Sequence, residues 1–408
     1  MMQEALMALS TSPAVTRWSP LYFLSSVGAG GLVVTFFMYL MFWVPHPDRP
    51  VPVFEDISAA FASGQPALQA SIAIALLGVA WFAWRTFALL AFNLRRVGAF
   101  RASEAGRAHA ASNAGTQMMA LPLALAMAVN VAFIVGLVFV PGLWGVVELL
   151  FPFALAAFVL IGAMAFRQLG AFLGRALSSG GFDCAANNSF AQLLPAFTLA
   201  MVGVGLAAPG SMSGSATVAG ISVILSGFFL VAAIVIGAVA MVLGVRSMME
   251  NGVSVEAAPT LLIVLPLVTV ASILLLRQWH GLHVHFDGHS GPAETLVFLS
   301  RMVSLQVLFA MFGLLVLARV GYWQRFVFGA ETSAGSYALV CPGVAFSVLL
   351  QFWINKGLVA TGLIAKFGIA YWGLTAVALV AQAAMIVLVL RLNRQHFGQS
   401  SVAAVPAE

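Results

Sequence analysis

Cysteine is the residue in this chain that most directly suggests covalent chemistry. The two cysteines are Cys184, in a polar stretch, and Cys341, beside a proline in an apolar run. A reactive thiol needs a positive neighbour or a helix N-terminus to stabilise the thiolate. Cys341 lies near the expected start of a helix. One hypothesis is therefore a membrane thiol oxidoreductase, or a carrier of a sulfur or selenium species, that uses Cys341; the alternative is an unreactive buried thiol.

Histidine is the second chemical candidate, because four of the seven histidines fall within residues 280–289. Imidazoles suit Zn²⁺, Cu²⁺ or Ni²⁺. The spacing matches no closed metal site, so we expect a polar outer loop without a resident metal. A low-affinity metal or proton-sensing site is the alternative. Its residues would be His280, His283, His285 and His289.

A hydroxyl residue six positions before a proline recurs four times. The pairs are Thr116 with Pro122, Ser189 with Pro195, Thr260 with Pro266, and Ser336 with Pro342. The prolines are 73, 71 and 76 residues apart. An earlier apolar run contains a glycine cluster instead, at Gly28, Gly30 and Gly31. A period of this length indicates repeated supersecondary units.

The elements that carry these residues must be membrane helices. The chain has 408 residues, of which 62% are apolar and 8% charged, and its mean hydropathy is +1.03. A soluble protein has about 25% charged residues. Secreted disulfide scaffolds, disordered chains and nucleic-acid binders are excluded by the cysteine count, the apolar content and the absence of a basic stripe.

Ten apolar runs are long enough to span a bilayer, which takes about 20 residues in a helix. They cover roughly residues 21–43, 68–92, 116–139, 144–165, 189–208, 217–243, 257–277, 295–318, 335–354 and 367–390. Of the 18 basic residues, 12 lie on one side if the N-terminus is inside, and four on the other. The positive-inside rule therefore favours both termini in the cytoplasm. We expect one transmembrane domain, 1–408, with a cytoplasmic segment at 1–20 and a disordered cytoplasmic tail at 391–408.

The prolines all fall in odd-numbered spans. A proline removes a backbone hydrogen bond and kinks a helix, and kinked backbone in a membrane belongs inside protein or beside a hydrated cavity. The sequence thus predicts an all-α fold of five helical hairpins, with kinked odd helices inside and even helices outside. This arrangement favours a central pore, although prolines that only shape packing are the simpler alternative.

Neutral polar residues on the odd helices are the candidates for lining that pore. Hydroxyls and amides can solvate an anion without trapping it, whereas interhelical hydrogen bonding is their structural alternative. No acidic residue lies deep in an odd helix, which favours anions or neutral solutes. The candidates are Ser25, Asn130, Gln192, Thr260, Thr269 and Gln351, with Gly28, Gly30, Pro122, Pro195, Pro266, Cys341 and Pro342 shaping the path.

Three segments resemble the tellurite-resistance and dicarboxylate transporter (TehA) family, which includes the plant slow anion channels. They are 23–31, 258–266 and 336–342. The resemblance implies five hairpins around a central pore, and a homotrimer. That family closes its pore with a phenylalanine in the ninth helix, where this chain has Cys341, so the plug would be absent or moved. A fainter likeness is to the bacterial TsoY membrane family, which sometimes contains selenocysteine.

These observations favour a channel or secondary transporter that passes a small inorganic or organic anion through a bacterial inner membrane. The path would be lined by helices 1, 3, 5, 7 and 9. We expect no cofactor, because no phosphate-binding loop, catalytic triad or haem-ligating histidine pair is present. The Cys341 thiol enzyme is the alternative, and a membrane subunit that binds a soluble partner through the basic segment 93–115 is a third.

Overall fold

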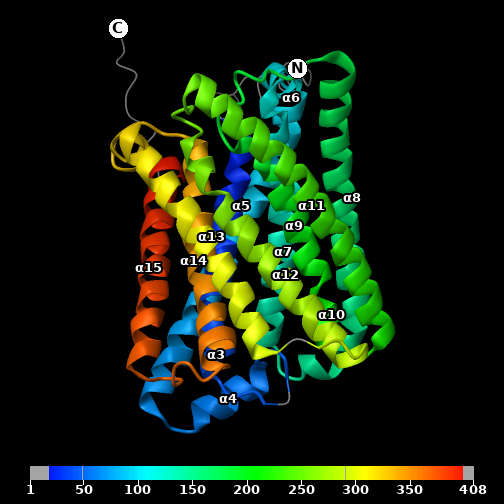
Figure 1. Cartoon of the computed structure of the whole chain (residues 1–408), viewed down its shortest axis with the longest axis vertical. Coiled ribbons are helices and arrows are strands. Elements are labelled where there is room, and N and C mark those ends of the chain that lie inside the picture. Colours follow the sequence, from blue (N-terminus) through cyan, green and yellow to red (C-terminus); the bar gives the residue numbers. More distant parts are fainter. Residues whose placement is uncertain (1–17, 48, 290, 398–408) are drawn as a thin grey trace, which may run out of the picture.

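The computed structural model describes residues 18–47, 49–289 and 291–397. Most of these residues are helical (Figure 1). Ten helical spans among them are long and apolar enough to cross a membrane, as the hydropathy pattern predicts. Each span takes in one or more helical elements. The spans are Pro20–Trp43, Pro66–Ala102, Asn113–Phe139, Leu143–Ser179, Ala191–Met212, Ala216–Asn251, Ala258–His285, Pro292–Arg319, Ala334–Val359 and Ile369–Phe397.

The even spans each consist mainly of one long α-helix. At 1.5 Å per residue, α5, α8 and α11 reach roughly 50 Å, which exceeds the ~30 Å hydrocarbon core. They therefore project into the aqueous phase at one end of the molecule. Their bounds are α5 Pro66–Ala102, α8 Val147–Ser179, α11 Ala216–Asn251, α13 Pro292–Arg319 and α15 Ile369–Phe397.

The odd spans are assembled from several pieces. Each begins with a short 3₁₀ segment, and the main α-helix follows. The 3₁₀ segments are η1 Pro20–Tyr22, η2 Asn113–Met119, η4 Ala191–Leu193, η5 Ala258–Leu262 and η7 Ala334–Leu339. The helices are α3 Phe23–Trp43, α7 Ala120–Phe139, α9 Leu194–Leu206, α12 Val264–His285 and α14 Val340–Phe352.

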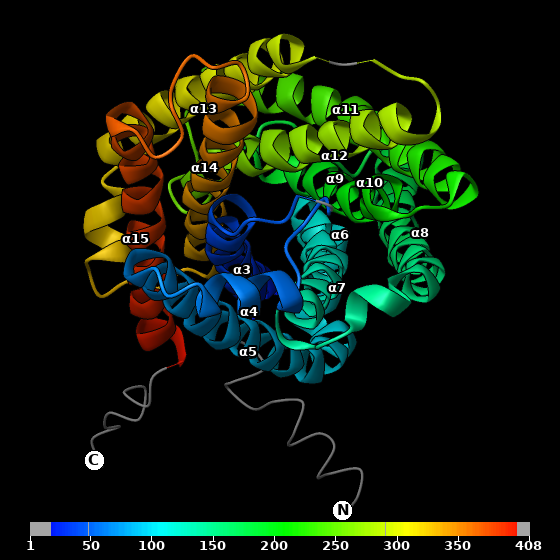
Figure 2. The same ribbon diagram turned by 90° about the horizontal axis from the view of Figure 1, so that it is seen from below.

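The odd spans are also the more buried ones. Within their most apolar windows, 83, 56, 83, 67 and 72% of residues are buried, against 44, 33, 33, 17 and 28% for the even spans, in chain order. Seen along the bundle, α3, α7, α9, α12 and α14 lie nearer the axis than α5, α8, α11, α13 and α15 (Figure 2). Since the outer spans expose their apolar faces, they are the ones suited to contact lipid.

Both described ends of the chain lie at the same end of the bundle (Figure 1). The hydroxyl of Tyr22, before α3, lies 3.0 Å from Nδ1 of His396, near the end of α15. An even number of spans requires this arrangement. We call this end the predicted inner end, and the opposite one the predicted outer end.

The four repeated prolines mark the start of regular α-helix. Each is the second or third residue of its α-helix. That α-helix follows the 3₁₀ segment with at most one residue between the two. Proline fits the first turn because its missing N–H is not needed there. In the fifth span, the Ala191 carbonyl accepts a hydrogen bond from the Leu194 amide instead. Bending of the helix axis at these prolines stays a prediction.

The repeated hydroxyl residues serve the same junctions. The Thr260 hydroxyl donates to the Ala257 carbonyl at 2.6 Å and accepts from the Phe190 amide at 3.0 Å. The Ser336 hydroxyl lies 2.8 Å from that of Tyr322. The six-residue spacing therefore corresponds to a polar group at the 3₁₀ turn and a proline at the α-helical start.

Two short helices and one boundary differ from the sequence prediction. The connectors contain α4 Phe54–Ala62 at the predicted outer end and α6 Glu104–Ala111 at the inner end. The predicted disordered tail at 391–408 begins too early, because α15 continues to Phe397. Arg391 donates to the carbonyls of Val327 and Phe328, which ties this last turn to the preceding connector. Residues 398–408 and 1–17 lie outside the described part.

Candidate functional site: a central cavity

A cavity of about 510 Å³ lies among the five odd spans. All five contribute to its wall, joined by α8 and the start of α13. Most of the lining is apolar, with many aromatic and thioether side chains. The phenylalanines and methionines are Phe37, Met38, Met41, Met127, Phe133, Phe151, Phe158, Phe197, Met201, Met212 and Phe352.

The cavity opens at the predicted outer end. Its lining there includes Pro50 and Val51 from the connector after α3, and Gly291 and Pro292 at the start of α13. The exposed Ala360, beyond the ninth span, completes the rim.

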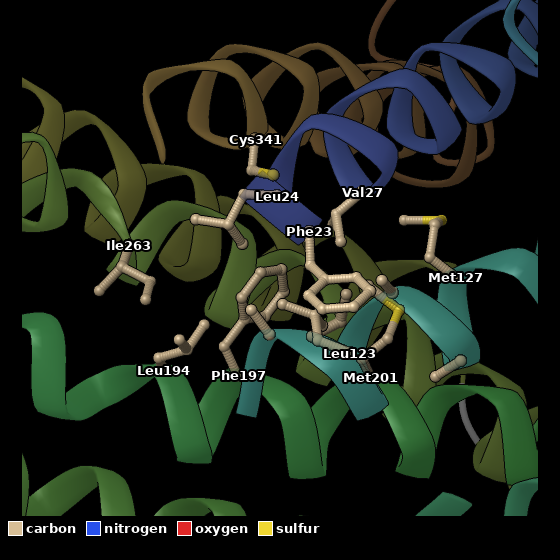
Figure 3. Packing of buried hydrophobic residues seen from close by; sticks show 14 of the residues in the cluster. Phe23, Leu24, Val27, Leu123, Met127, Leu194, Phe197, Met201, Ile263 and Cys341 are labelled. Carbon is tan, nitrogen blue, oxygen red and sulfur yellow. The ribbon is translucent and has the colours of Figure 1, made fainter. Parts of the chain in front are cut away.

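An apolar seal closes the other end of the cavity. We define it as Phe23, Leu24, Leu123, Leu194, Phe197 and Ile263, which come from the first, third, fifth and seventh spans. In Figure 3 the rings of Phe23 and Phe197 lie next to each other at its centre, with Cys341 close by on α14. Phe23 is 0% exposed and Phe197 3%. Phe197 also lines the cavity, so it forms part of the floor.

At the position where the resemblance to the TehA family implies a phenylalanine, this chain has Cys341, and the phenylalanines of the apolar seal come from other helices. Phe197 on α9 and Phe23 on α3 belong to the same buried cluster as Cys341 (Figure 3). No spacing in the sequence indicated this, because apolar residues are abundant in every span.

Two of the six polar pore candidates line the cavity: Asn130 on α7 and Thr269 on α12. The Asn130 amide nitrogen donates to the Ala126 carbonyl at 3.0 Å, so its amide oxygen is the atom free to face the cavity. The Thr269 hydroxyl donates to backbone carbonyls of Leu265 and Ala345, both at 3.1 Å. Thr269 therefore joins α12 to α14 as well.

The other four candidates do not line the cavity. The Ser25 hydroxyl donates to the Tyr22 carbonyl at 2.7 Å, and the Gln192 amide to the Asn113 carbonyl at 3.0 Å. Thr260 belongs to a 3₁₀ turn, and Gln351 is 3% exposed and accepts from Asn355. These residues satisfy backbone or interhelical contacts, which is the structural alternative for such groups.

The glycine and proline candidates act mainly through packing. A Cβ at Gly28 would lie 2.8 Å from Val340, and one at Gly30 would lie 2.5 Å from Met127. The glycines therefore let α3 approach α14 and α7 closely. Pro266 lines the cavity, whereas Pro122, Pro195 and Pro342 are buried without lining it.

Two cationic residues at the wall were missed by the sequence analysis. Arg277 on α12 and Lys356 in the ninth span both line the cavity, and no Asp or Glu is among its lining residues. The sequence places Arg277 at the end of the seventh span, but α12 continues for eight residues to His285. Its guanidinium donates to the Val204 carbonyl on α9 at 2.7 Å. Among the described residues, neither cation has a carboxylate within salt-bridge distance.

Irregular backbone surrounds these cations. The fifth span is interrupted at Ala207, between α9 and α10 (Ala208–Met212), two residues before Pro209. The ninth span ends in a π-helical segment, η8 (Trp353–Val359), which contains Lys356. Such π segments occur preferentially at functional sites. Broken backbone at membrane depth is tolerated where it lines a cavity.

Ion pairs and hydrogen bonds fix the connectors around the mouth. Arg49 forms a 2.5 Å ion pair with Asp56 of α4. The Gly142 amide donates to Glu55 at 2.7 Å, which fastens α4 to the connector after α7. On the opposite side, Glu148 accepts from the Ser213 hydroxyl at 2.7 Å. These contacts tie α4 and α8 to the connectors around the mouth.

The two cysteines lie in different settings. Cys341 is 8% exposed and reaches the cavity floor, whereas Cys184 is exposed in the connector between α8 and the fifth span. Both are free thiols. Cys341 is the second residue of α14, as expected.

The four histidines do not gather into one metal site. His280, His283 and His285 lie on α12 and not in an extended loop. His283 hydrogen-bonds the Gly288 carbonyl at 2.9 Å, and His285 the Ser213 carbonyl at 2.9 Å. Among the described residues, no group of three or more His, Cys, Asp or Glu side chains is placed to hold a metal ion. His280 and His283 line the cavity instead.

The comparisons with known proteins give no relative from which to transfer a function: no family model, curated protein or solved structure matches this chain.

Proposed function

We propose that this protein is a channel or secondary transporter that passes anions along the axis formed by the five odd spans. The observation that carries the proposal is the cavity wall: it combines Arg277 and Lys356 with no carboxylate. A cavity with low-dielectric walls and one sign of charge concentrates ions of the opposite sign. Cations would be repelled from it.

The apolar seal defines the closed step of this transport. Transfer of an ion through a dry apolar constriction carries a large desolvation penalty, so passage requires the Phe23 and Phe197 rings to move. Hydrophobic constrictions gate other channels by dewetting. The seal would open toward the predicted inner end, where the hydroxyls and 3₁₀ turns of the odd spans lie.

The proposal includes the wider setting of the molecule. We place it in a bacterial inner membrane. We place both termini in the cytoplasm because α5, α8 and α11 each carry at least one arginine near the predicted inner end. The five hairpins with kinked inner helices are inferred from the recurring prolines of the odd spans. The homotrimer is what the resemblance to the TehA family implies.

Flux through proteoliposomes tests the function. The purified chain should pass nitrate, chloride or thiosulfate faster than protein-free liposomes, and potassium should not exceed the protein-free rate. Arg277→Gln and Lys356→Gln should each lower anion flux by about tenfold, which corresponds to about 1.4 kcal/mol. Phe197→Ala should raise it, because the seal loses a ring.

Arg301→Gln is the matched control. Arg301 lies on α13, is exposed and does not line the cavity. Its replacement removes the same charge and should leave anion flux unchanged. Equal losses for Arg277→Gln and Arg301→Gln, or selective cation flux, would contradict the proposal.

Cys341 supports a second candidate, the thiol enzyme or sulfur-species carrier, because its side chain reaches the cavity floor. Cys341→Ala separates the two: anion flux survives the change under the transport proposal and is lost if Cys341 acts covalently. The described residues around Cys341 in the apolar seal supply no positive charge, which makes transport the better-supported function.

A further inference from the structure

The cavity is built for a larger occupant than a simple inorganic ion. Its volume of about 510 Å³ falls within the range of about 300–1,000 Å³ that is typical of small-molecule sites. A halide or oxyanion would fill a small part of it and would leave the apolar wall exposed to water. The size of the cavity therefore points to an organic molecule.

The polar groups are distributed unevenly along the cavity. Arg277 donates to the carbonyl of Val204, which is seven residues along α9 from the floor residue Phe197, or roughly 10 Å. On α12, Arg277 is eleven residues from Pro266 at the floor, or roughly 16 Å. His280 and Lys356 lie still closer to the mouth. The cationic groups thus occupy the outer part of the cavity.

The inner part has a different character. Val27, Met127, Phe197 and Met201 line it, with the neutral amide of Asn130 on the same wall. Methionine side chains are flexible and polarisable, so they adapt to apolar bodies of irregular shape. A second charged group on a ligand would lie here without a counter-charge, which is costly.

We infer that the cavity binds an organic anion with a single charged head group, held by Arg277 and Lys356, and an apolar body packed against the Phe and Met wall. The inference rests on the proposed anion transport and names its substrate class. A carboxylate or sulfonate on an aromatic or short aliphatic body fits this description. A short dicarboxylate does not, because it has no apolar body to cover the Phe and Met wall.

Binding of radiolabelled 1-naphthoate to the full-length protein in phosphatidylcholine nanodiscs tests the inference, with empty nanodiscs subtracted. We expect saturable binding that unlabelled 1-naphthalenesulfonate displaces. Succinate, chloride and the neutral 1-naphthalenemethanol should displace it at least ten times less well. Displacement by succinate or chloride as effective as by the sulfonate would overturn the inference, as would an absence of saturable binding.

Three variants locate the head group. Arg277→Gln should weaken naphthoate binding about tenfold, which is the scale of a charge-assisted hydrogen bond in affinity. Arg277→Lys keeps the charge and should retain most of the binding, which shows that the site is still folded. Arg301→Gln, away from the cavity, should bind like the wild type. Equal binding by Arg277→Gln and the wild type would refute the assignment.

Two further arms separate the inference from its premises. Nanodiscs that contain phosphatidylglycerol test whether an anionic lipid is the occupant: loss of naphthoate binding only in these discs would overturn the assignment to a soluble anion. Flux of nitrate in proteoliposomes reports on the proposed function separately. Nitrate flux without naphthoate binding would leave transport standing and refute the substrate class, whereas binding without any anion flux would refute transport.

Discussion

Replacement of Gly281 by alanine tests the packing that positions the cationic part of the cavity. Gly281 lies on α12, one turn beyond Arg277, and faces α10. A Cβ at this position would lie 2.2 Å from the carbonyl oxygen of Gly210 and 2.9 Å from its carbonyl carbon. Both atoms are backbone, so no side chain can turn away. The two helices would have to separate by about 1 Å to restore van der Waals contact.

The expected cost follows from this separation. Overpacking of a well-packed site costs about 1–3 kcal/mol. Intrinsic helix propensity contributes little, because membrane helices persist when their tertiary contacts are lost. We therefore expect Gly281→Ala to lower the free energy of unfolding by about 1–3 kcal/mol. Anion flux should fall as well, since α12 carries Arg277.

Denaturation with sodium dodecyl sulfate in mixed micelles, followed by circular dichroism, measures the stability change. Gly98→Ala is the matched control. Gly98 is also helical, on α5, and a Cβ there would meet no atom within 4 Å. Its replacement should change stability by less than about 0.5 kcal/mol. If both variants unfold at the wild-type midpoint, the close approach of α10 and α12 is not a packing constraint and the reasoning fails.

Three other predictions concern single side chains. In a Cys184→Ser background, Cys341 should react with thiol reagents added from the predicted outer side. A negatively charged methanethiosulfonate reagent should modify it several times faster than a positively charged one, and equal rates would contradict the cationic cavity. Glu148→Gln should lower the free energy of unfolding by about 1 kcal/mol, because it weakens the charge-assisted hydrogen bonds that Glu148 accepts from Ser213 and Gly214 before α11. An unchanged unfolding midpoint would contradict this. Arg325 lowers the pKa of the Glu331 carboxyl through a hydrogen bond. Their ion pair therefore stabilises the fold above the carboxyl's unfolded pKa and loses that effect as pH falls through the folded pKa. Glu331→Gln should be less stable than wild type near pH 7, and unfolding curves should show the difference shrinking as pH is lowered past the unfolded pKa of about 4.3; a difference that does not depend on pH would contradict this.

The number of spans was predictable because bilayer thickness fixes the length of an apolar run. The more buried status of the odd spans also followed from a sequence pattern, the recurring prolines. The local meaning of that pattern was less accessible. The prolines mark where a 3₁₀ turn becomes α-helix, and a one-dimensional spacing cannot separate such a junction from a proline deeper in a helix.

The charged part of the cavity was the least predictable feature. Arg277 follows an apolar run, where an arginine ordinarily anchors a helix end at the interface. Its position on the cavity wall depends on two facts that hydropathy does not encode: α12 continues to His285, and α9 presents the Val204 carbonyl. Thr260 and Gln192 show the opposite case, since they look like pore residues but satisfy backbone groups at the inner end.

The one-sided opening of the cavity has an electrical consequence. When water fills the cavity, its interior is close to the potential of the outer solution, and most of the membrane voltage falls across the apolar seal and the packed helix starts beyond it. Moving one elementary charge through 100 mV changes its energy by about 2.3 kcal/mol. Under the proposed transport, an anion beside Arg277 experiences little of this voltage, and its passage past Phe197 experiences most of it. The rate of that passage should therefore vary steeply with membrane potential, while occupancy of the cavity should not.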